Sequence, residues 1–477
     1  MERRVTQVSE EFPNPLQTGA SKVTVTRPRA ARTVLNAFQS LMRQWSKLHP
    51  YNAGQVMRVT GPADRDRWKL ATESVISELG LGKPHFLKGE SVVEFLPAQE
   101  VAIESAGDMQ TFFNEELNRP FASGDVPIRF CILPAERVNE EETHYLAAVY
   151  DHWIADSRAM RELMQRIFER YRNGGTGTIN DLPPLRLQVT PFNTLYRKFV
   201  GRIPRLAATR ESLKNLWRHR KGYRLHLKDP MDFQSRFLMR DLAPGLIDRL
   251  YRFAKANHAS VNDLFIAVIG QTMGTATAAN RLTRSFKTMH FKKRQIGIGT
   301  IVDIRDAAKE PLDRVFNLYL SSYSMMLDNP EKRSTAELTG AIGTETRRIK
   351  DNQLAVKGYA ALVTADFWYS VYSSPKFHAT LLHKSVPVVA GISNVNMTGT
   401  WADPNAAARE DVGDEPRVLD YLRISPAGPL IPLVFTLTTI GNRLSLCVTY
   451  RSTAFHADRL TTIVDNFIER LEAVGRE

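Results

Sequence analysis

The sequence is poor in cysteine and contains no long hydrophobic run. Its 477 residues include two cysteines, Cys131 and Cys447, which form neither a metal-binding spacing nor a disulfide framework and so favour a reducing, cytoplasmic environment. Apolar stretches such as Leu264–Ile269 fall far short of the roughly 20 residues that span a bilayer. The N-terminal residues lack the apolar segment of a secretory signal. We therefore expect a soluble cytoplasmic protein, or at most one bound peripherally to a membrane.

Several sequence motifs of well-known enzyme classes are also missing. The chain has no GxSxG elbow, P-loop, HExxH or CxxC. Gly297 and Gly299 lack the third glycine of a dinucleotide-binding fingerprint, because Val302 stands in its place. A Ser-His-Asp hydrolase therefore has no support in the sequence. We predict neither a metal nor a tightly bound cofactor.

Acidic residues are outnumbered, and the positive surplus is concentrated. The formal net charge is +13, with 64 Lys and Arg against 51 Asp and Glu. The segment 197–228 holds eleven basic residues and one acid, Glu211, and 281–294 holds six basic residues and no acid. This pattern suits an anionic partner, such as an acidic carrier protein, CoA phosphates or a membrane surface; a solvated basic helix face explains it equally well. Nucleic acid is disfavoured because no nucleic-acid-binding motif accompanies the charge.

The length and one linker suggest two domains. A chain of 477 residues with 43% hydrophobic composition is too long for a single compact unit. Asn173–Gly177, rich in glycine, and the following Pro183-Pro184 form the strongest linker pattern. We predict an irregular N-terminal arm over residues 1–33, a first subdomain over 34–178, and a second over 179–477 that contains the basic segment 197–228.

The stretch His144–Ser157 carries the chemistry that we consider first. Tyr145–Tyr150 is an apolar run typical of a buried strand, and Asp156-Ser157 begins a helix whose apolar residues recur at helical spacing from Met160 to Tyr171. His152 is thus predicted at a rigid corner where the strand ends. Histidine exchanges a proton near neutral pH, so a histidine held in this way is a natural general base.

Other segments have clear periodicity. They predict strands at Gln55–Thr60, Val92–Leu96, Pro127–Leu133, Ile296–Ile304, Val388–Val395, Leu433–Thr439 and Leu444–Tyr450, and helices after Asp64, over Pro244–Asn257, from Ser260 to Met273 and over Ala457–Val474.

The His-x-x-x-Asp spacing between a strand and an amphipathic helix resembles the HHxxxDG signature of the condensation-domain and CoA-dependent acyltransferase superfamily. That superfamily includes nonribosomal peptide condensation domains, wax ester synthases and polyketide-associated acyltransferases. Further segments resemble its landmarks in the same order: PIRFCIL at 127–133, SVNDLFIAVI at 260–269, DIR at 303–305, Asn317 and VVAGISNV at 388–395. The chain departs from the signature at Asp151, which replaces the first histidine, and at Ser157, which replaces the glycine.

The resemblance implies an α/β (α+β) fold of two chloramphenicol-acetyltransferase-like sandwich subdomains, arranged as a V around a central cleft or tunnel. It assigns catalysis to His152 and makes Asp156 a structural residue that pairs with an arginine, for which Arg305 is the candidate. A carboxylate at a helix start also caps backbone amides. Asp151 should point away from His152 but raise its pKa somewhat.

Other residues have weaker indications. Ser393 and Asn394 are candidates to stabilise an oxyanion or position a substrate, although a turn-forming Ser-Asn pair after a strand explains them as well. Arg218, Arg220 and Lys221 are candidates for docking a carrier protein or CoA. The resemblance as a whole implies an acyltransferase that moves an acyl group from an acyl carrier protein or acyl-CoA to a hydroxyl or amine acceptor. The alternative is a catalytically degenerate relative that only binds a carrier protein or a lipid.

Overall fold

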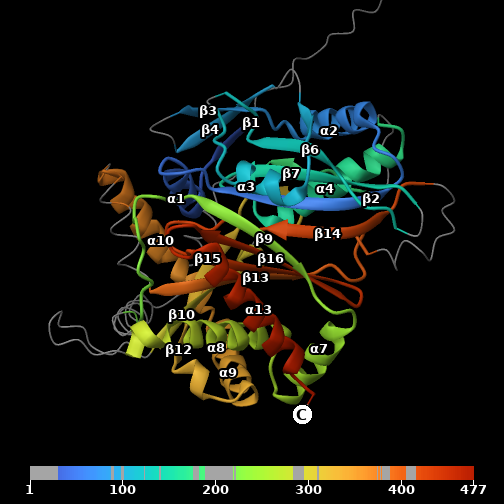
Figure 1. Cartoon of the computed structure of the whole chain (residues 1–477). Helices are drawn as coiled ribbons and strands as arrows, with labels where there is room; N and C mark the ends of the chain where they lie inside the picture. The colour runs from blue at the N-terminus through green and yellow to red at the C-terminus, as the bar shows by residue number, and fades with distance from the viewer. Residues whose placement is uncertain are drawn as a thin grey trace, which may run out of the picture.

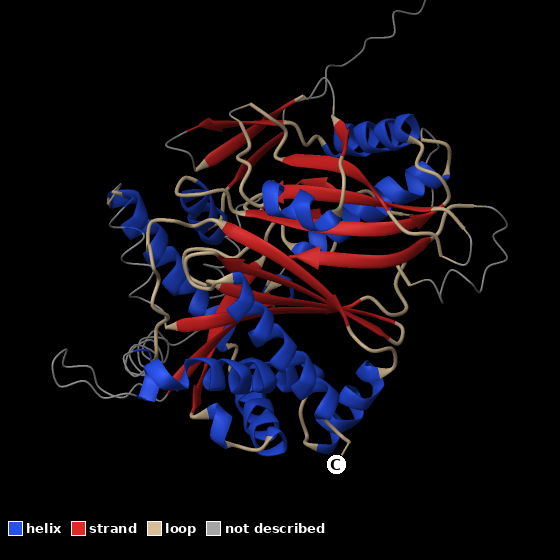
Figure 2. Cartoon of the chain, in the orientation of Figure 1, coloured by secondary structure: helices blue, strands red, loops and turns tan. Residues whose placement is uncertain are grey.

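The structure is a computed structural model of the whole chain. It describes residues 31–87, 91–97, 101–122, 124–138, 141–175, 182–187, 219, 222–282, 295–308, 311–372, 374–375, 378, 387–403 and 415–476. Two sheet-and-helix halves lie one above the other in Figure 1, and Figure 2 shows strands of both halves facing the region between them.

The first half is built on a five-stranded sheet in the order β14-β2-β7-β6-β5. Its strands from this part of the chain are β2 (Asn52–Thr60), β5 (Ile103–Ser105), β6 (Ile128–Pro134) and β7 (Thr143–Asp151). The helices of this half are α1 (Ala37–Ser46), α2 (Arg65–Leu79), α3 (Met109–Glu116) and α4 (Ser157–Arg172). A small sheet of β1 (Ala31–Val34), β4 (Val92–Leu96) and β3 (Lys83–Leu87) lies at its outer edge.

Strand β7 is apolar from Tyr145 to Tyr150 because both faces of its sheet are covered. Leu146, Ala148 and Tyr150 join the core that includes α2 and α4, whereas Ala147 and Val149 join a second core with α3 and strands of the other half. Successive side chains of a strand point to opposite faces, so burial on both sides requires an uninterrupted apolar run. This burial holds the end of β7, where His152 follows, in a fixed position.

The second half is built on a six-stranded sheet in the order β12-β10-β13-β15-β16-β9. Its strands are β9 (Ser235–Asp241), β10 (Gln295–Asp303), β12 (Leu320–Asp328), β13 (Val388–Asn396), β15 (Leu433–Ile440) and β16 (Arg443–Arg451). Its helices are α7 (Leu246–Ala256), α8 (Val261–Leu282), α9 (Thr335–Asp351), α10 (Leu354–Val371) and α13 (Ala457–Ala473). Helix α8 packs against α7, α9 and α13 on the face of the sheet away from the first half. The short elements are β8 (Arg186–Leu187), β11 (Val315–Phe316), η1 (Arg305–Ala307) and η2 (Pro330–Lys332).

One strand ties the halves together. β14 (Val418–Ile424) belongs to the C-terminal part of the chain, yet it pairs antiparallel with β2 at the edge of the first sheet, with Leu422 opposite Val56. The chain then returns to the second sheet through β15. Residues of β14 thereby stand at the junction of the halves.

The predicted mixed α/β fold with two sheet-and-helix subdomains is confirmed, and the strands and helices predicted from periodicity are present. Helix α8 continues to Leu282, beyond the expected end at Met273. Strand β1 begins at Ala31, so the last residues of the arm predicted as irregular are ordered. The subdomain division after residue 178 stays a prediction, and most of the basic segment 197–228 lies outside the described residues.

Candidate active site

His152 lies at the corner between β7 and α4. The backbone amide of His152 donates to the carbonyl of Tyr51 at 3.1 Å, which extends the strand pairing by one residue. Helix α4 then begins at Ser157, and the N-cap Asp156 accepts a hydrogen bond from the amide of Ala159 at 2.9 Å. A paired strand end and a capped helix start therefore hold the corner from both sides.

The imidazole of His152 is held in one orientation. Its Nδ1 lies 3.1 Å from the carbonyl oxygen of Ala155. A carbonyl oxygen only accepts hydrogen bonds, so Nδ1 carries the proton and Nε2 of the neutral ring keeps its lone pair. The ring stacks on Tyr51 and meets Tyr150 edge-on, both at 5.8 Å between centroids. Among the described residues none is hydrogen-bonded to Nε2.

Burial lowers the pKa of His152 below its usual value. The desolvation of the ring outweighs the hydrogen bond to Ala155 and the negative charge of Asp156, which both act to raise that pKa. The imidazole is therefore neutral at pH 7, the form in which it can accept a proton.

The ring borders a cavity of about 680 Å³ whose walls come from both halves. Tyr150, His152 and Ser157 line it from the first half, and β10 and β13 line it from the second. Its lining also includes Ile301 and Lys350, which are exposed, so the cavity opens at the surface. A substrate can therefore reach the histidine from solvent.

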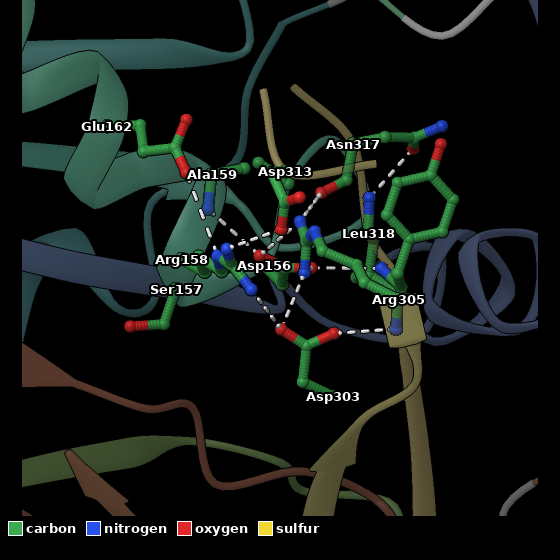
Figure 3. A network of polar contacts seen from close by, with 12 residues as sticks. Asp156, Ser157, Arg158, Ala159, Glu162, Asp303, Arg305, Asp313, Asn317 and Leu318 are labelled. Atoms are coloured by element: carbon green, nitrogen blue, oxygen red, sulfur yellow. Dashed lines mark hydrogen bonds and ion pairs between the residues drawn. The ribbon is translucent and has the colours of Figure 1, made fainter. Parts of the chain in front are cut away.

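Asp156 and Arg305 form a buried ion pair (Figure 3). The guanidinium Nη1 of Arg305 lies 2.7 Å from Oδ2 of Asp156, and Nη2 donates to Oδ1 at 3.0 Å. The amide of Tyr319 donates to Oδ2 at 2.9 Å, and Arg305 also pairs with the partly exposed Asp303. Burial alone would raise the pKa of Asp156, but the charge of Arg305 and these hydrogen bonds lower it. The pair that the resemblance implied is thus present, and it joins the site loop to η1, which follows β10.

Asp151 turns away from His152, as strand geometry requires. Its carboxylate accepts from the Ser46 hydroxyl at 2.7 Å and from Nε1 of Trp153 at 2.9 Å. Burial raises the pKa of Asp151 to about 6, against these hydrogen bonds. The expectation that Asp151 raises the pKa of His152 is wrong: that pKa is lowered, because desolvation of the ring dominates and Asp156, not Asp151, supplies the opposing charge.

The carboxyl of Asp151 should make stability depend on pH. Its pKa is about 6 in the folded protein and about 3.9 in the unfolded chain, so the folded state binds more protons between these values. The contribution of Asp151 to the free energy of unfolding therefore falls by about 3 kcal/mol as pH rises through this window. Asp151→Asn cannot titrate, and urea unfolding at about pH 4.5, 5.5 and 7 should show a flatter profile than the wild type. The same slope in both proteins would contradict this account.

The other site candidates lie on the cavity wall or outside the described chain. Ser393 and Asn394 of β13 both line the cavity, and within the described chain Asn394 Oδ1 is buried without a hydrogen-bond partner. Arg218, Arg220 and Lys221 lie outside the described residues.

Two arginines of the cavity wall were not anticipated from the sequence. Arg161 on α4 and Arg423 on β14 both line the cavity that contains His152. Arg161 lies four residues after Ser157 and therefore on the same face of α4. This spacing is the sequence signal that could have identified Arg161 as a cavity residue. Nothing in the local pattern around Arg423 predicts that β14 crosses into the first sheet.

The described residues contain neither a cluster of metal-ligating side chains nor a membrane-spanning helix. No group of three or more His, Cys, Asp or Glu side chains in the described ranges is placed to hold a metal ion. No helix in those ranges combines the length and apolarity that a membrane span requires.

Solved structures with the same fold are condensation domains and related acyltransferases. The first condensation domain of the CDA synthetase matches with a TM-score of 0.66 at 14% identity, covering 94% of this chain and 97% of that one. TRI3, the trichothecene 15-O-acetyltransferase from Fusarium sporotrichioides, matches with a TM-score of 0.64 at 12% identity, covering 94% of this chain and 95% of that one.

 The X-domain from teicoplanin biosynthesis, solved in complex with OxyB, matches at 0.56 and 15% identity, covering 95% of each chain. No family model and no curated protein matches the sequence. The comparisons therefore establish the fold of condensation domains.

Proposed function

We propose that the protein is an acyltransferase that moves an acyl group from a thioester to a hydroxyl or amine acceptor, with His152 as the general base. The observation that carries the proposal is the imidazole itself. Its tautomer is set by Ala155, its Nε2 is free of described partners, and it borders a solvent-connected cavity between the two halves. The condensation-domain fold of the neighbours supports the same chemistry.

The reaction follows from this geometry. Nε2 of His152 takes the proton of the acceptor hydroxyl or amine as the acceptor oxygen or nitrogen bonds to the thioester carbonyl carbon. The carbonyl oxygen becomes an oxyanion, for which the Ser393 hydroxyl and the Asn394 amide are the proposed donors. When the tetrahedral intermediate collapses, the C–S bond breaks and the imidazolium returns its proton to the departing thiolate. Asp156 takes no part in proton transfer; it positions the loop through Arg305.

The donor is proposed to be either acyl-CoA or an acyl carrier protein, because both present the acyl group on the same phosphopantetheine arm. Neither requires a metal or a tightly bound cofactor. Arg218, Arg220 and Lys221 are the proposed docking residues for the anionic donor, since their charge suits either an acidic carrier protein or CoA phosphates. Peripheral contact with an anionic membrane remains a proposal on the same grounds.

Mass spectrometry of products tests the proposal. The purified protein is incubated with a panel of acyl-CoAs and acyl carrier proteins, each with alcohol and amine acceptors. An acylated acceptor that forms with the wild type, but not with His152→Asn, supports the assignment. A panel without any acylated product, from a protein shown to be folded, would count against it.

The pH profile of the reaction provides a further prediction. A general base works in its neutral form, and burial lowers the pKa of His152 below its usual 6.5. We therefore expect kcat/KM to rise with pH, to pass its midpoint below about pH 6.5, and to be level from there to about pH 8. Initial rates in a constant-ionic-strength buffer series measure this. A midpoint above pH 7 would mean that another group controls the rate.

A binding protein is the second candidate function. Asp151 and Ser157 depart from the superfamily signature at two positions beside the histidine. The X-domain, which shares the fold, was solved in complex with OxyB, so the fold also occurs in protein complexes. A wild-type protein that captures an acyl carrier protein in a pull-down, yet leaves its thioester intact with every acceptor, would favour this alternative.

A further inference from the structure

Two arginines face the cavity without an ion-pair partner among the described residues, although the charge of Asp156 acts on Arg161 from a longer distance. Arg161 and Arg423 both line it, and Arg423 is only 2% exposed. No carboxylate among the described residues forms an ion pair with either. A buried charge without a partner is costly, so structures rarely keep one unless something else compensates it.

Both guanidinium groups converge on the hydroxyl of Ser157. Nη1 of Arg161 lies 3.1 Å from Ser157 Oγ, and Nη1 of Arg423 lies 3.4 Å from it. Nε2 of Gln55 lies 3.3 Å from the same oxygen. A hydroxyl oxygen has two lone pairs, so it cannot satisfy three donors. In the described chain Arg161 makes no other side-chain hydrogen bond, which leaves N–H groups available to a ligand.

Arg423 is held rigidly, because each of its five N–H groups has a neutral acceptor, including Thr438 Oγ1 at 3.4 Å from Nε and Ser157 Oγ at 3.4 Å from Nη1. Its Nη2 donates to the carbonyl of Leu437 at 2.7 Å and to that of Ser393 at 3.3 Å, and its Nη1 donates to Ser393 Oγ at 3.1 Å. Burial and the neighbouring charge of Arg161 lower the pKa of Arg423 to about 9, so it is still a cation at pH 7. An anion would supply the charge that these neutral acceptors lack.

The arginines and the histidine belong to one continuous wall. Tyr150 contacts the ring of His152 edge-on, and its hydroxyl shares a hydrogen bond with Gln55. Gln55 in turn donates to Ser157, where the two guanidinium groups meet. A ligand whose charged end lies on the arginines can therefore extend along Tyr150 toward Nε2.

We infer that Arg161 and Arg423 form an anion subsite that binds the carboxylate of one substrate, carried by either the acyl group or the acceptor. The planar guanidinium of Arg161, which makes one side-chain hydrogen bond in the described chain, can match a carboxylate through paired hydrogen bonds, and Arg423 adds its positive charge. Ser157 then has a role of its own: in place of the signature's glycine, its hydroxyl holds the two arginines together. Figure 3 shows this side chain pointing away from the Asp156–Arg305 network. The inference deepens the proposed function and depends on it only for the identity of the substrate.

Ligand binding to the full chain tests the subsite without any turnover. The probes are hexanoate and hexanamide, which match in size and differ in charge, and calorimetry or ligand-observed NMR measures their affinities. We expect hexanoate to bind the wild type at least about tenfold more tightly, a difference of about 1.4 kcal/mol. Arg161→Gln and Arg423→Gln should each remove this preference. Arg161→Gln loses a single described hydrogen bond, so it provides the test if Arg423→Gln fails to fold.

Arg158→Gln is the matched control. Arg158 lies on the same helix and borders the same cavity, but it pairs with Asp313 at 2.9 Å and with Asp303 at 3.5 Å. This variant should keep the preference for hexanoate. Equal affinity of the two probes for the wild type, or an equal loss in all three variants, would overturn the subsite.

Turnover then identifies which substrate carries the charge. Succinyl-CoA is compared with butyryl-CoA as donor, and 3-hydroxybutyrate with butan-2-ol as acceptor. A loss of about tenfold in kcat/KM in Arg423→Gln, confined to the charged member of one pair, assigns the carboxylate to that substrate. If Arg423→Gln changed kcat/KM equally for the charged and the neutral member of both pairs, the inference would be overturned and the proposed function would stand. A preference for hexanoate without any acyl transfer would support the anion subsite and count against the proposed function.

Discussion

Replacement of His152 is expected to reduce turnover by about 10²–10⁴-fold, the usual cost of removing a general base. His152→Asn is the sharper variant, because its side-chain amide can still donate to the carbonyl of Ala155, as Nδ1 does at 3.1 Å. It has no group that accepts a proton near neutral pH. Steady-state rates with the best substrate pair from the product screen measure the loss.

The control is His456→Ala. His456 is exposed and precedes α13 without a side-chain capping bond, so its loss should leave the rate unchanged. Circular dichroism and thermal unfolding establish that both variants are folded. If His152→Asn were folded and retained wild-type turnover, the imidazole would not be the base and the mechanism would have to be abandoned.

The second large effect is expected on stability, from the buried ion pair. Asp156→Asn keeps an oxygen that can cap α4 but removes the charge facing Arg305, whose side chain is 2% exposed. Breaking a buried pair by removing one partner typically costs about 3–5 kcal/mol, because the other charge remains buried. Asp156→Ala should cost about 1 kcal/mol more, since it also removes the cap. Equilibrium unfolding in urea measures both.

Asp303→Asn is the matched control for this pair. Asp303 also contacts Arg305, at 3.1 Å, but its side chain is 37% exposed. A contact open to water contributes about 0–1 kcal/mol, so this variant should be close to the wild type. Equal losses from Asp156→Asn and Asp303→Asn would show that the burial of the pair does not determine its contribution. The lowered pKa of Asp156 also fixes the direction of the pH dependence. The stabilisation that its carboxylate provides is present at neutral pH and is lost as pH falls through the folded-state pKa.

The elements around the candidate site could be predicted because their causes are local. The apolar run before His152 requires a buried strand, and Asp156 requires a helix start, because a carboxylate at that place satisfies free backbone amides. The pairing of Asp156 with Arg305 was expected only from the superfamily resemblance. The two partners are 149 residues apart in the chain. Periodicity alone does not connect them.

The partners of Asp151 and the pKa of His152 depend on packing. The carboxylate of Asp151 bonds to Ser46 of α1, which is 105 residues away in the chain. The pKa of His152 falls because folding removes water from its ring. Neither effect can be predicted from positions along the chain. For His152 we expected a raised pKa, whereas the pKa is lowered.

The sequence by itself determined the strand, the corner and the capped helix that hold His152, because hydrogen bonding and side-chain periodicity act over a few residues. Only the tertiary structure decided what faces that histidine. Strand β14 leaves the second half to pair with β2, and this crossing brings Arg423 to Arg161 and Ser157. Such a juxtaposition depends on how the two sheets pair and pack, and these contacts join residues that are hundreds of positions apart.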